Sequence, residues 1–163
     1  MKQANKIFER ILTTEKLNPQ LKRWKLLGKS VSFTNGVFDI LHEGHIKVLT
    51  EAAFFADILL VGVNSDASVK RLKGSDRPVN NQDSRSLVLA SLLMVDAVII
   101  FEEDTPLELI RIVLPDVLVK GGDYDINSIV GAKEVMANKG TVEIIPLEAE
   151  FSTTAIIEKL KKL

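Results

Sequence analysis

The chain contains only two histidines, and they stand three residues apart in the segment His42-Glu43-Gly44-His45. Residues at positions i and i+3 lie on one face of a helix, so the two imidazoles can face one ligand together. Gly44 has no Cβ, which lets an anion approach the backbone between them. Two imidazole N–H donors at a helix N-terminus are suited to stabilise the charge that develops on phosphorus during a transfer reaction.

Two other interpretations of this pair stay open at the level of sequence. The histidines could be surface or helix-capping residues that bind no ligand. They could also bind a metal ion, but the chain has no cysteine and no third histidine. A carboxylate such as Asp39 or Glu43 would then have to complete the site, and we predict no metal-ligand set.

The elements that must position the pair can be predicted from the pattern of apolar residues. Short β-branched runs alternate with longer helical patterns after about residue 30. The expected strands are Val31–Thr34, Ile58–Val63, Ala97–Phe101, Val117–Val119 and Val142–Ile145. The expected helices cover about 43–55, 82–94, 106–113, 128–138 and 153–162. This alternation predicts an α/β fold: a Rossmann-like, doubly wound sheet of about five parallel strands with helices on both faces.

Three further local predictions follow from the sequence. Residues 1–29 are expected to form an N-terminal helical extension, with two short helices flanking Asn18-Pro19, before a domain over 30–163. Thr105 is expected to cap the helix that follows, with Pro106 at its first position. The segment from Asn64 to Gln82 reads as a long polar loop after a strand, at the edge where open α/β sheets bind ligands.

Composition excludes several classes of protein. The 163 residues include 21 basic and 22 acidic side chains, so the net charge of −1 does not favour a nucleic acid partner. Asp57 and Asp96 interrupt the two most apolar segments, and neither segment could span a membrane. The N-terminal segment does not resemble a signal peptide. The absence of cysteine fits a reducing compartment, so we expect a cytoplasmic protein.

The segment from Phe33 to His45 resembles the HxGH signature of the cytidylyltransferase-like nucleotidyltransferases. The similarity continues through Val63–Val69, Lys73-Gly74 with Arg77–Asn80, Phe101–Pro106, Leu118–Tyr124 and Ser152–Ile157. Together these stretches resemble the D-glycero-β-D-manno-heptose 1-phosphate adenylyltransferases, which make ADP-heptose for lipopolysaccharide cores and related surface glycans. The resemblance implies that ATP and a sugar 1-phosphate, with Mg²⁺, give ADP-heptose and pyrophosphate. Small members of this superfamily often self-associate, so we expect a homo-oligomer, namely a homodimer.

The resemblance and the spacing together assign roles to individual residues. The candidate catalytic residues are His42, His45, Lys73 and Arg77. The candidate nucleotide-binding residues are Phe33, Thr34, Asn35, Gly36, Phe38, Asp39, Gly44, Lys120, Gly121, Gly122, Asp123, Ser152, Thr153 and Thr154. Asn64 and Arg85 are the candidate substrate-binding residues. Asp39 is also a candidate to orient a histidine or a metal-bound water.

Plainer roles remain for several of these residues. The Asn-Gly and Gly-Gly pairs could simply form turns, the loop cations could be solvated, and Ser152 could be only a helix cap. The overall function also has alternatives. The sequence does not show which nucleotide base is bound, so one alternative function is that of a glycerol-3-phosphate cytidylyltransferase. A non-catalytic nucleotide-binding module on the same fold is another.

Overall fold

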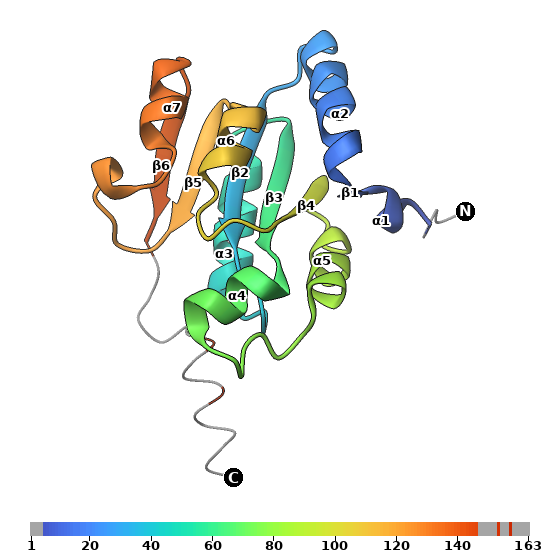
Figure 1. Ribbon diagram of the computed structural model, residues 1–163. Coiled ribbons are helices and arrows are strands. Elements are labelled where there is room, and N and C mark those ends of the chain that lie inside the picture. Colours follow the sequence, from blue (N-terminus) through green and yellow to red (C-terminus); the bar gives the residue numbers. More distant parts are fainter. Residues whose placement is uncertain (1–4, 147–152, 154–156, 158–163) are drawn as a thin grey trace.

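The computed structural model describes residues 5–146, Thr153 and Ile157 of the chain. In this part of the chain, six strands form one parallel sheet in the order β1-β4-β3-β2-β5-β6 (Figure 1). The strands are β1 (Ile11–Leu12), β2 (Val31–Gly36), β3 (Ile58–Asn64), β4 (Ala97–Phe101), β5 (Val117–Gly121) and β6 (Thr141–Ile145). The helices are α1 (Lys6–Glu9), α2 (Thr14–Leu26), α3 (Glu43–Phe54), α4 (Asp66–Lys73), α5 (Gln82–Ala90), α6 (Leu107–Val113) and α7 (Ala132–Ala137), with a 3₁₀ turn at Ile126–Ser128.

Helices cover both faces of the sheet because successive strand residues point to opposite sides. In β3, Leu60 belongs to one buried cluster, while Leu59 and Val61 belong to the other. The first cluster is completed by side chains from α2, α6 and α7, and the second by side chains from α3 and α5. The near-continuous apolar strands predicted from sequence are therefore buried on both faces, as a parallel sheet requires.

The order of the strands creates one switch point. From β2 the chain proceeds outward through β3 to β4, and then returns through α6 to place β5 on the other side of β2. Ligands of open α/β sheets bind in the crevice at the carboxyl ends of the strands at such a point. The carboxyl ends of β2 and β5 therefore mark the expected binding region, and α3 begins beside it (Figure 1).

The predicted α/β fold is confirmed, with one strand more than expected. The residues around Ile11 were assigned to a helical pattern, but Ile11 and Leu12 form β1 and pair with Val98 and Ile99 of β4. Arg10 fixes this short strand: its Nη1 donates hydrogen bonds to the carbonyls of Ala90, Leu92 and Val95, at 3.1, 3.3 and 3.0 Å.

Asn18-Pro19 does not separate two helices as predicted, because one continuous helix, α2, runs through Pro19. The helical pattern expected before it is reduced to the short α1 and to β1. Leu17 and Trp24 of α2 are buried in the first cluster. Residues before position 30 thus contribute to the same core and sheet as the rest, while the division into an extension and a domain stays a prediction.

Two other local predictions were wrong. The polar segment after Asn64 is not all loop, because Asp66–Lys73 forms α4, capped by the Ser65 side chain, which accepts from the Ser68 N–H. Helix α6 begins at Leu107 with Pro106 in the capping position, so Thr105 is not its cap. The helix expected over 153–162 lies outside the described residues except for Thr153 and Ile157, which are helical.

Candidate active site at the carboxyl edge of the sheet

The two histidines flank the first turn of α3, as their spacing predicted. His42 is the N-cap of the helix, with extended backbone angles, and its carbonyl accepts hydrogen bonds from the N–H groups of His45 and Ile46. The helix N-terminus carries unpaired N–H groups and a partial positive charge, which favour an anion. The imidazoles are therefore placed beside an intrinsic phosphate-binding feature of the backbone.

The imidazole rings stack on each other. Their centroids lie 3.8 Å apart with 27° between the planes, and the ring of Phe38 lies 5.3 Å from His45. Burial lowers the pKa of His42, and burial, His42 and Lys73 together lower the pKa of His45 to about 4. The His45 ring is consequently uncharged at neutral pH. Uncharged imidazoles each keep one N–H to donate, which suits stabilisation of a phosphate more than storage of a proton.

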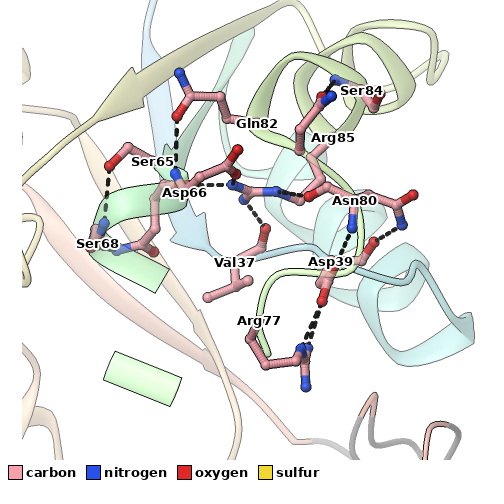
Figure 2. A network of polar contacts seen from close by, with 12 residues as sticks. Val37, Asp39, Ser65, Asp66, Ser68, Arg77, Asn80, Gln82, Ser84 and Arg85 are labelled. Carbon is pink, nitrogen blue, oxygen red and sulfur yellow. Dashed lines mark hydrogen bonds and ion pairs between the residues drawn. The ribbon is translucent and has the colours of Figure 1, made fainter. Parts of the chain in front are cut away.

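Asp39 and Arg77 meet in the polar network of Figure 2. Arg77 Nε donates to Asp39 Oδ2 at 2.8 Å, and Nη2 makes an ion-pair contact of the same length without hydrogen-bond alignment. The backbone N–H groups of Val79 and Asn80 also donate to this carboxylate. Burial alone would raise the pKa of Asp39, but these hydrogen bonds and the Arg77 charge outweigh it and lower that pKa.

This geometry corrects one prediction and qualifies another. The Asp39 carboxylate accepts from residues 77–80, so it does not orient a histidine. Arg77 lies in the expected region, but its guanidinium is held by Asp39. Sequence reasoning also missed Asn80, whose side chain donates to the Asp39 carbonyl at 2.7 Å. The only signal was its place at the end of the Arg77–Asn80 stretch.

Arg85 was predicted to bind substrate, which stays a prediction, and in the structure its guanidinium is bound by the protein itself. Its side chain is 0% exposed, and Figure 2 shows its guanidinium in contact with Val37, Asp66 and Asn80. The guanidinium donates to the carbonyls of Asn80, Val37 and Asn64 at 3.0, 2.5 and 2.8 Å, and to Asp66 Oδ1 at 2.8 Å. Arg85 therefore joins the segments that follow β2, β3 and α4, and its donors face protein acceptors.

Lys120, near the end of β5, reaches across to the end of β2. Its Nζ lies 2.9 Å from Asn35 Oδ1 and 3.3 Å from the Asn35 carbonyl oxygen. Burial lowers the pKa of Lys120 to about 8, so the side chain is still mostly a cation at neutral pH. The two residues were both predicted to bind nucleotide, and the structure brings them together at the switch point.

The remaining predicted residues fall into three groups. Phe33 is 0% exposed and packs in the core, so its side chain does not bind nucleotide, and the Thr34 side chain is also buried. Gly36, Gly44, Gly121, Gly122 and Asp123 lie at the carboxyl ends of β2 and β5 or in the first turn of α3. Asn64 ends β3, where its side chain donates to Ser68 Oγ.

Glycine is required at one of these positions. Gly122 has a φ of +135°, and a Cβ there would lie 2.5 Å from the ring of Tyr124. The predicted Ser152 and Thr154 lie outside the described residues. Thr153 Oγ1 lies 3.4 Å from the Ile40 carbonyl, on the segment that leads to the histidines.

Two hollows in the described part of the chain differ in how they relate to the predicted residues. A cavity of about 170 Å³ is lined by Phe38, Asp39, Asn80 and Arg85 among others. A larger hollow of about 540 Å³ lies at the opposite edge of the sheet, beside α2, and is lined by none of the predicted residues.

Within the described residues, no group of three or more histidine, aspartate or glutamate side chains is placed to hold a metal ion. None of the helices described is long and apolar enough to cross a membrane.

Comparison with known proteins agrees with this arrangement. The chain is 54% identical over 149 residues to the "Bifunctional protein HldE" of Hyphomonas neptunium and 56% identical over 138 residues to that of Mesorhizobium japonicum. These matches cover 91% and 85% of this chain but only 31% and 28% of the relatives. The chain therefore spans about a third of the length of the curated relatives it matches.

Solved structures show the same fold. The lipopolysaccharide core biosynthesis protein from Thermoplasma volcanium is 30% identical with a TM-score of 0.60, over 74% of this chain and 98% of that one. The pantoate-beta-alanine ligase from Francisella tularensis shares the fold at 14% identity, with a TM-score of 0.61 over 94% of this chain and 78% of that one. The family model described as cytidylyltransferase-like matches residues 33–159. With an HxGH pair at the start of α3 and this match over most of its length, the chain belongs to the cytidylyltransferase-like family of nucleotidyltransferases.

Proposed function

We propose that this chain is an adenylyltransferase that converts ATP and D-glycero-β-D-manno-heptose 1-phosphate to ADP-heptose and pyrophosphate. The observation that carries the proposal is the stacked pair of His42 and His45 at the N-terminus of α3, beside the switch point of the sheet. The identity to the HldE proteins and the name of the Thermoplasma volcanium structure support the heptose and lipopolysaccharide assignment. Because those relatives are about three times longer, no second activity is carried over to this chain.

The reaction needs positioning and electrostatics more than proton transfer. An oxygen of the sugar phosphate attacks the α-phosphorus of ATP and forms a new P–O bond, while the bond to the β-phosphate breaks and pyrophosphate leaves. The attacking oxygen is already anionic, so no general base is required. His42 and His45 donate N–H groups to the charge that gathers on the α-phosphate, and the N-terminus of α3 adds its positive end.

The cations near the histidines have distinct roles in this proposal. Lys73 ends α4 and lies close enough to His45 for its charge to lower the pKa of that imidazole. It is exposed, so it can move toward the leaving pyrophosphate. Arg77 is held by Asp39, and it acts by fixing the segment that follows α4 beside the site.

In this proposal, Mg²⁺ binds together with ATP. The described residues hold no cluster of carboxylates and histidines able to cage the ion. Mg²⁺ keeps most of its water when bound, so the phosphate oxygens and water would coordinate it. When bound, it would neutralise charge on the triphosphate. A reaction that consumes ATP also fits a cytoplasmic protein, and the homodimer remains a prediction that light scattering can test.

A second candidate is a cytidylyltransferase that uses glycerol 3-phosphate, because the description of the matching family names cytidylyl transfer and no acceptor. The two are separated by measuring pyrophosphate release from ATP and from CTP, with Mg²⁺, in the presence and absence of each acceptor. Release with ATP and the heptose phosphate alone supports the proposal, and His45→Asn is the inactive control. Release with CTP and glycerol 3-phosphate supports the second candidate. ATP binding with no release from any acceptor would favour a non-catalytic binding module.

A further inference from the structure

Strands β2 and β5 separate before either strand ends. They pair at only two positions, Ser32 with Val117 and Phe33 with Leu118. On its other side, β2 pairs with β3 over six positions, from Val31 to Gly36. On its own outer side, β5 pairs with β6 over its full length to Gly121. The last residues of β2 and β5 are thus in the sheet but not bonded to each other, and the gap lies at the switch point.

The Lys120 side chain spans this gap. If the ladder continued in register, Asn35 would stand opposite Lys120 as the second pair after Phe33 and Leu118. Instead, the Lys120 ammonium reaches the Asn35 carbonyl and side-chain oxygens at 3.3 and 2.9 Å. A partly buried backbone acceptor without a strand partner is therefore satisfied by a side chain.

Among the residues that the structure describes, no carboxylate balances the charge of Lys120. None of the ion pairs found among the described residues includes Lys120, and Asn35 supplies only neutral oxygens. The cause of its lowered pKa is burial. By contrast, the guanidinium groups of Arg77 and Arg85 each face a carboxylate. A largely buried cation without a counter-ion is costly, and an anion that enters the gap would remove that cost.

We propose that Lys120 binds a phosphate oxygen of the substrates at the floor of the gap between β2 and β5, using the N–H donor that Asn35 does not occupy. An ammonium has three donors, and two contacts to Asn35 leave one available. The inference rests on the proposed function for the identity of the anion. The phosphate can belong to the nucleotide or to the sugar 1-phosphate, since both meet at this edge.

Three substitutions separate charge from structure. Lys120→Gln keeps an N–H donor for Asn35 but removes the charge, Lys120→Arg keeps the charge, and Lys120→Met removes both. Lys133 is exposed on α7, so Lys133→Met is the matched control. Calorimetry then measures the dissociation constants of MgATP, adenosine and the sugar 1-phosphate, and thermal unfolding of the ligand-free proteins is recorded alongside.

The expected result is that Lys120→Gln and Lys120→Met weaken binding of MgATP, of the sugar 1-phosphate, or of both, by at least tenfold. Binding of adenosine, which has no phosphate, should be unchanged, and Lys120→Arg should recover part of the loss. The ligand that loses affinity identifies the source of the phosphate. Lys133→Met should bind all three ligands like the wild type.

Three outcomes would overturn the inference. Lys120→Gln could bind both phosphate ligands as tightly as the wild type, which would leave Lys120 a bridge between strands. Adenosine and MgATP could lose affinity equally, which would place Lys120 at the base. Lys120→Arg could bind as poorly as Lys120→Met although it unfolds at the wild-type temperature. Failure of the proposed function looks different: the wild type would bind these phosphates without releasing pyrophosphate.

Discussion

The rings of His42 and His45 lie face to face with 3.8 Å between their centroids. Burial is the main reason that the pKa of His45 falls to about 4, and the charges of His42 and Lys73 lower it further. The free protein thus presents uncharged rings. A bound phosphate places negative charge beside the rings, which favours their protonated form.

Replacing either histidine should abolish most of the activity without unfolding the protein. We expect His42→Asn and His45→Asn to lower turnover by a factor of about 100 or more, because each removes a donor to the transition state. The unfolding temperature should change little, since neither side chain is fully buried. Single-turnover formation of the sugar nucleotide is the measurement. Glu43→Gln, in the same turn and exposed, is the control, and wild-type rates in both histidine variants would contradict the mechanism.

The lowered pKa of His45 makes a prediction about acid stability. Its folded pKa is about 4 and its ordinary value is 6.5, so between these values the unfolded chain binds a proton that the folded protein does not. The free energy of unfolding should therefore fall as the pH drops from 6.5 toward 4, with the full contribution present above 6.5. Urea unfolding at pH 7.5 and 4.5 tests this. His45→Asn should show a smaller loss, and an equal loss would assign the effect to other groups.

The contact between Asp39 and Arg77 should act on both stability and substrate binding. Asp39→Asn leaves a guanidinium without its partner and weakens the hold on residues 77–80, at a cost of ~3–5 kcal/mol if the pair behaves as a buried one. Arg77→Gln should cost less, because the backbone N–H groups of Val79 and Asn80 still bind the carboxylate. A double-mutant cycle on unfolding energies and on KM gives the coupling. Additive effects of the two substitutions would show that the pair is not coupled.

Arg85 is expected to support the fold and not the chemistry. Arg85→Met removes the donors for three carbonyls and Asp66, and should destabilise the protein by ~3–5 kcal/mol. Arg111 on α6 is half exposed and forms ion pairs with Glu108 and Glu134, so Arg111→Met should cost much less stability than Arg85→Met. Denaturant unfolding measures both. If Arg85→Met were stable but had a raised KM, the original substrate-binding prediction would regain support.

The sequence predicted the α/β alternation and the histidine pair because both depend on local signals. Apolar runs mark buried parallel strands, and the spacing of His42 and His45 depends only on helix geometry. Helix α4 was missed because Val69 is its only buried apolar residue, and its cap, Ser65, resembles a loop residue. Strand β1 was missed because a two-residue strand shows no periodicity.

The roles of the basic residues were harder to predict for a different reason. A sequence shows that Arg77, Arg85 and Lys120 are cations, but not which acceptor each one meets. The contacts of Arg85 were not foreseen because its partners are backbone carbonyls from three separate segments. The contact of Lys120 with Asn35 joins residues 85 positions apart, across strands that are neighbours only through the switch of strand order.

Strand β1 has a consequence for how the protein behaves in solution. Strand β1 pairs with the outer side of β4. Without it, the free N–H and C=O groups of β4 could pair with a strand of another molecule, and exposed edges of this kind promote aggregation. Since β1 contributes only two pairs, it ends the sheet without extending a long new edge. The three hydrogen bonds from Arg10 to backbone carbonyls hold β1 in this protective position.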